Sequence, residues 1–186
     1  MATPSAQEHA GLLKLAERQF QLVLAVRFGC TFGTQPLKVP RVIQYGRRVV
    51  TEDDVALTRD EADEAAAVLE HTATYTLSLQ MVQAMKDAFV SPRKHGDQNV
   101  RAAFEISRLL RNAYAHQPFR PHWSIDPECQ NQVYEAAGIA RLNTTGLQGR
   151  PVRWQDYGGK LALFWLSRYV RSAIWPAEPV ALGPAS

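Results

Sequence analysis

Two long stretches of this chain carry apolar residues at the three- and four-residue spacing of an amphipathic helix, and both open with the same start signal. Residues 5–8 (SAQE) and 58–61 (TRDE) match the capping box, in which two side chains bond each other's backbone N–H groups. The first stretch predicts a helix that ends at Gly29. The second predicts the longest element, which runs to Phe89 and is closed by Pro92.

Two further helices complete a mainly α fold. Asp97 can cap a helix that ends near His116 because Pro118 follows, and residues 160–175 form a strongly apolar fourth helix. We therefore expect one domain, residues 1–175, built as an antiparallel bundle of about four helices. Residues 176–186 are expected to be a disordered tail.

The segments between these helices predict smaller features. Residues 29–57 form a long connection with a short extended piece at 41–45. After the third helix, residues 123–126, 132–135 and 151–155 have strand-like composition and are separated by glycines. We expect a small β-hairpin insertion at about 120–156, between the last two helices.

The distribution of charge and the number and spacing of the cysteines limit the classes of function that the chain could have. Residues 51–70 hold eight acidic residues against one arginine, a net −7, so the rest of the chain carries +10 and offers a positive face for a polyanion. Cys30 and Cys129 do not have the spacing of metal ligands, and we expect both to be free thiols. The sequence shows no membrane span and no secretory signal, so we expect a cytoplasmic protein. The glycine-rich, serine-elbow and His-Glu-x-x-His motifs of common enzymes are absent, and we assign no metal and no cofactor.

The third predicted helix carries the most specific pattern. Projection at 100° per residue places five polar residues on one arc of this helix: Arg101, Glu105, Arg108, Asn112 and His116. Arg111 lies at the margin of this arc. Arginine and histidine in a last turn can simply satisfy free carbonyls and the negative end of the helix dipole. The helical geometry alone is therefore compatible with either a structural or a functional role for these residues.

Residues 111–116 (RNAYAH) resemble the Arg-x4-His signature of HEPN domains, the higher eukaryotes and prokaryotes nucleotide-binding family. Residues 117–123, 149–152 and 156–159 also look like a group of bacterial HEPN-like proteins, so the resemblance covers roughly 57–175. It implies a helical bundle that forms a homodimer and cuts RNA without metal. The hairpin insertion and residues 29–57 depart from the minimal family pattern.

The resemblance implies catalytic roles for Arg111, His116 and Asn112. Metal-free RNA cleavage needs a group that moves a proton and a cation that stabilises the phosphorane, which His116 and Arg111 can supply. Asn112 would orient His116 or a phosphate oxygen, and the RNA 2′-hydroxyl would be the nucleophile. Three further residues are predicted to bind RNA: Arg108, Tyr114 and Arg120.

The first hypothesis is thus a homodimeric endoribonuclease, a toxin or defence effector restrained by an antitoxin or nucleotidyltransferase partner. The alternative is a non-catalytic HEPN-like module that binds RNA or a nucleotide or only dimerises. A third interpretation is a helical protein whose basic arc docks an acidic partner. We expect His71 to be a surface or packing residue and the late aromatic residues to be core or interface residues: Trp154, Phe164, Trp165 and Trp175.

Overall fold

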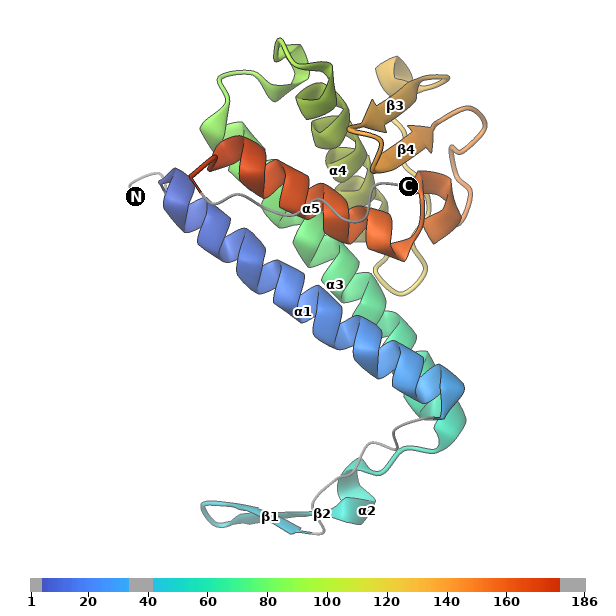
Figure 1. The fold of residues 1–186 in the computed structure, drawn as a ribbon. Coiled ribbons are helices and arrows are strands. Elements are labelled where there is room, and N and C mark those ends of the chain that lie inside the picture. Colours follow the sequence, from blue (N-terminus) through green and yellow to red (C-terminus); the bar gives the residue numbers. More distant parts are fainter. Residues whose placement is uncertain (1–4, 34–41, 178–186) are drawn as a thin grey trace.

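The computed structural model describes residues 5–33 and 42–177 (Figure 1). It is mainly helical, as predicted. The four long helices are α1 (Ala6–Phe32), α3 (Arg59–Ala88), α4 (Gln98–His116) and α5 (Lys160–Ile174). None of the helices in the described ranges combines the length and apolarity needed to cross a membrane.

The helix starts confirm the sequence prediction. Ser5 and Thr58 each form a capping box, with Glu8 and Glu61, and the Asp97 side chain accepts a hydrogen bond from the Asn99 N–H at 2.7 Å. The predicted end at Gly29 is wrong, because α1 continues to Phe32 and ends at Gly33, whose φ of 64° suits glycine. A helix tolerates an interior glycine at a cost of about 1 kcal/mol.

In the helical body, α1 and α3 run antiparallel along each other, α5 lies across them, and α4 packs against α3 (Figure 1). Large apolar side chains from all four helices meet in one core. Its fully buried members include Leu13, Phe20, Leu77, Met81, Ile106, Leu109, Leu163 and Leu166. Burial of such a side chain contributes about 1.5–3 kcal/mol.

The insertion between α4 and α5 contains the predicted hairpin, and its first strand coincides within one residue with the stretch expected to be extended at 132–135. β3 (Val133–Ala136) pairs antiparallel with β4 (Ala140–Asn143). Residues 123–126 and 151–155 were expected to be extended, but neither forms a strand: η3 (Trp154–Tyr157) is a 3-10 helix and His122 makes only an isolated bridge to Pro151.

The insertion belongs to the core and is not a mere appendage. Trp123 is 1% exposed, and its indole Nε1 donates to Asp156 at 2.8 Å. Ile125, Leu142 and Tyr157 are buried in the same core as α4 and α5. This packing holds the insertion against α4 (Figure 1).

Residues 42–55 form a second small unit. β1 (Val42–Tyr45) pairs with β2 (Arg48–Thr51), and α2 (Glu52–Val55) follows. They lie beyond the end of α1, away from the other helices (Figure 1). The extended piece predicted at 41–45 thus corresponds to β1, except for residue 41, which lies outside the described residues. Residues 178–186 of the predicted tail also lie outside them. The second strand and α2 were not predicted.

Candidate functional site

The middle of α4 is buried, and both of its ends reach the surface. From Ala102 to Leu110 every residue of this helix is buried, because α3, α5 and the insertion cover it. After that point Arg111 and Asn112 are half-buried, and Ala115 and His116 are exposed. The predicted catalytic residues therefore lie where α4 opens to solvent.

Arg111 is a partly buried cation. Its Nε is buried and has no hydrogen-bond partner, and no carboxylate among the described residues lies within ion-pair distance of it. Three other buried or half-buried arginines form ion pairs with carboxylates, for example Arg171 with Glu17 at 3.2 Å, whereas half-buried Arg101 bonds only carbonyl oxygens and Arg168 lies over aromatic rings. A buried N–H group without a partner costs about 1–3 kcal/mol, and because this Nε is covered, an anion could bond to it only after the side chain moved.

His116 is the last residue of α4, and its exposed imidazole stands at the negative end of the helix dipole. An ideal helix separates residues 111 and 116 by roughly 140° of rotation, so the two side chains flank one edge of the helix end. Asn112 lies one turn before His116. The three side chains can thus border one surface position with a cation, a titratable group and an amide.

Arg108 does not have the exposed position that the helical projection predicted. Its side chain is buried, and Nε donates to Glu105 Oε2 at 2.8 Å while Nη2 donates to Cys129 Sγ at 3.0 Å. Nη1 forms an ion pair with Asp126. These partners occupy its donors, so Arg108 fastens the insertion to α4 and is not placed to bind RNA.

Tyr114 and Arg120 have opposite environments. Tyr114 is 5% exposed, packs its ring 5.6 Å from that of His71, and has a pKa raised by burial. It is a core residue that RNA cannot reach without rearrangement. Arg120 is exposed in the turn after α4, where a phosphate could approach it.

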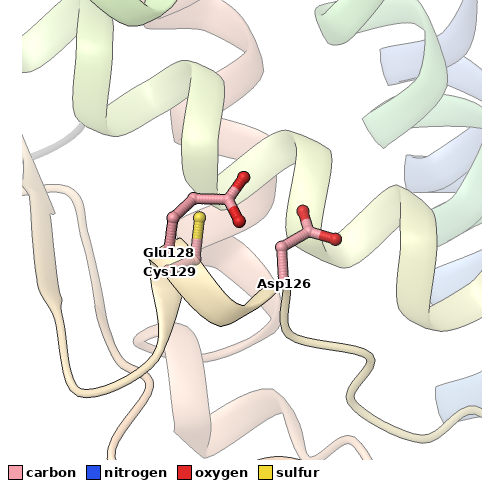
Figure 2. A group of neighbouring side chains, drawn as sticks. All are labelled: Asp126, Glu128 and Cys129. Carbon is pink, nitrogen blue, oxygen red and sulfur yellow. The ribbon is translucent and has the colours of Figure 1, made fainter.

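Three potential metal ligands meet beside η2 (Pro127–Cys129). The ligand atoms of Asp126, Glu128 and Cys129 lie within 4.8 Å of one another (Figure 2). Arginines already bind this set: Arg108 contacts Asp126 and Cys129, and Arg93 lies 3.3 Å from Glu128. Two guanidinium cations so close disfavour a metal ion, and we assign the group to structural pairing.

Sequence reasoning missed two residues near the end of α4. His71 Nδ1 lies 3.1 Å from the Pro118 carbonyl oxygen, and burial lowers the pKa of this imidazole. Trp154 was expected to be a core or interface residue; it is 46% exposed and therefore not part of the core, whereas Phe164 is buried and Trp165 and Trp175 pack against the core. The sequence signal that could have indicated an exposed Trp154 is its position next to Arg153 in a segment flanked by glycines.

No family model, curated protein or solved structure matches this chain.

Proposed function

We propose that this protein is a metal-independent endoribonuclease of the HEPN type, with Arg111, Asn112 and His116 at its catalytic centre. One observation carries the proposal: the Arg111 Nε is buried without a partner, beside the open end of α4 that presents His116. An arginine in this state is suited to bind an anion whose charge grows during a reaction.

The proposed reaction is an internal transesterification. The ribose 2′-hydroxyl loses its proton to a base and attacks the neighbouring phosphorus, and the bond to the 5′-oxygen breaks as that oxygen gains a proton. The products are a 2′,3′-cyclic phosphate and a 5′-hydroxyl. Arg111 stabilises the extra negative charge of the phosphorane, and His116 moves a proton, since histidine is the side chain that titrates near neutral pH.

The proposal includes a homodimer. Transesterification needs a base for the 2′-hydroxyl and an acid for the leaving oxygen, and two copies of His116 in one cleft could divide these tasks. Asn112 would hold the imidazole or a phosphate oxygen by hydrogen bonding. A cell must restrain such an activity, which favours a role as a toxin or defence effector with an antitoxin or nucleotidyltransferase partner.

The test is cleavage of total RNA in EDTA by the wild type and by Arg111→Ala and His116→Ala variants. Two exposed controls are matched in type or place: Arg18→Ala, another helical arginine, and Gln117→Ala, the neighbour of His116. We expect both site variants to lose at least a hundredfold in rate, as is usual for a general acid–base group, and both controls to keep the wild-type rate. Thermal melting checks that all variants fold.

Equal cutting by the wild type and both folded site variants would overturn the assignment. Binding of RNA without cutting, with the same affinity in the wild type and the His116→Ala variant, would instead identify a non-catalytic module.

A further inference from the structure

A shallow groove adjoins the open end of α4. It consists of two neighbouring hollows, of about 370 and 340 Å³, that share His71 and Val152. His71 comes from α3, residues 119–122 from the turn after α4, and residues 151–155 from the insertion. Tyr114 of α4 also lines the first hollow, and the turn begins just after His116, so the groove lies near the end of α4 although the proposed catalytic residues do not line it.

The exposed charges of this groove are positive. Arg120 and Arg153 are exposed, and neither forms an ion pair with any described residue. The acid at its edge, Glu70, is already bound by Lys160 Nζ at 2.8 Å and approached by Arg27 at 3.8 Å. A groove with two unpaired arginines and a neutralised acid attracts phosphate groups.

Two uncovered aromatic rings flank the same groove. Phe119 is 70% exposed and Trp154 is 46% exposed. Gly159 backs the indole, because a Cβ at that position would lie 3.7 Å from Trp154 Cε3, so the ring is held in place on one side. Aromatic rings beside a basic groove are the arrangement on which unpaired bases stack.

His71 adds a hydrogen-bond acceptor. The Pro118 carbonyl oxygen 3.1 Å from Nδ1 can only accept, so Nδ1 carries the proton of the neutral ring and Nε2 keeps a free lone pair. Burial lowers the pKa of His71 and therefore favours this neutral form. Such a nitrogen can accept a hydrogen bond from a ribose hydroxyl or a base amino group.

We propose that this groove binds the nucleotides of single-stranded RNA next to the phosphate that is cut, with Arg120 and Arg153 on phosphates and Phe119 and Trp154 on bases. The assignment rests on the proposed function, because it treats the groove as an extension of that site. The exposed rings favour RNA over an acidic peptide, which offers charge but no bases to stack.

The test is fluorescence anisotropy with a labelled single-stranded 12-mer of 2′-O-methyl RNA, which has no 2′-hydroxyl nucleophile and cannot be cut by the proposed reaction. The full chain is compared with Arg153→Ala, Trp154→Ala and, as the matched control, Arg141→Ala on β4, which is exposed outside the groove. We expect each groove variant to weaken binding roughly fivefold or more and the control to stay within about twofold. Melting curves confirm folding.

Unchanged binding in both folded groove variants would overturn the inference, as would displacement of the RNA by poly-glutamate at equal charge concentration. The two proposals fail separately. If Arg111→Ala and His116→Ala abolish cleavage but the groove variants bind normally, the groove assignment falls. If neither the wild type nor any variant cuts RNA while the groove variants lose binding, the catalytic assignment is wrong and the groove assignment is supported.

Discussion

At the scale of single residues, two arginines one turn apart on α4 have opposite environments. Arg108 is enclosed by Glu105, Asp126 and Cys129, whereas Arg111 keeps a buried Nε without a partner. The helical projection placed both on or beside one polar arc. It could not separate them, because two of the partners of Arg108 come from the insertion 18 and 21 residues later in the chain.

Arg108→Ala is expected to lower the free energy of unfolding by about 2–4 kcal/mol, because it leaves buried Glu105 without one of its cations and removes the link to the insertion. Chemical denaturation measures this loss. The control Arg141→Ala breaks only an exposed 3.8 Å contact with Glu135 and should change stability by no more than about 1 kcal/mol. Equal effects of the two substitutions would contradict a structural role for Arg108.

His71 predicts a pH dependence of stability. Burial lowers its pKa below the ordinary value of 6.5, so at slightly acidic pH the unfolded chain binds more protons than the folded one. Its contribution to stability therefore falls as pH drops through about 6.5 toward the folded pKa. Thermal melts of His71→Gln and the wild type at pH 7.5 and 5.5 test this prediction: acidification should destabilise the wild type more. An equal drop in melting temperature for the wild type and His71→Gln would contradict it.

At the scale of elements, the helices could be predicted because their signals are local. The capping boxes at Ser5 and Thr58 and the cap at Asp97 are all present in the structure. The end of α1 was misplaced because packing overrides the weak helix preference of Gly29. In the insertion, the stretch 132–135 was assigned correctly to within one residue, but 123–126 was wrongly expected to be extended because the burial of Trp123 depends on contacts with distant segments.

Trp123→Ala is expected to cost about 3–5 kcal/mol, because it empties a buried site and removes the bond to Asp156. Trp154→Ala, which removes a half-exposed indole from the same insertion, should cost far less. Equilibrium unfolding followed by circular dichroism compares the two. A small loss for Trp123→Ala would mean that the insertion is independent of the core.

At the scale of the whole molecule, the insertion and the neighbouring helices cover the middle of α4 and leave its first turn and its C-terminal end accessible. A second chain could therefore approach the Arg111 to His116 segment only at that end. Sequence reasoning located this segment correctly on a helix end, but it could not show that the polar arc before it is buried.

A site that needs two copies of the motif predicts that activity depends on protein concentration. Below the dissociation constant of the dimer, the cleavage rate per mole of chain should fall with dilution. Sedimentation measured over the same concentrations should show the monomer appearing where activity is lost. A monomer that cuts RNA at the full rate would contradict the composite site.

The most direct test of the central claim is the identification of the ends that the wild type leaves on a defined RNA in EDTA. Attack by the 2′-hydroxyl predicts 2′,3′-cyclic phosphate and 5′-hydroxyl ends in mass spectra, and no cutting where the nucleotide before the scissile phosphate is 2′-deoxy. His116→Ala should leave that RNA intact. Ends with a 3′-hydroxyl and a 5′-phosphate, or cleavage after a 2′-deoxy nucleotide, would contradict the mechanism assigned to Arg111 and His116.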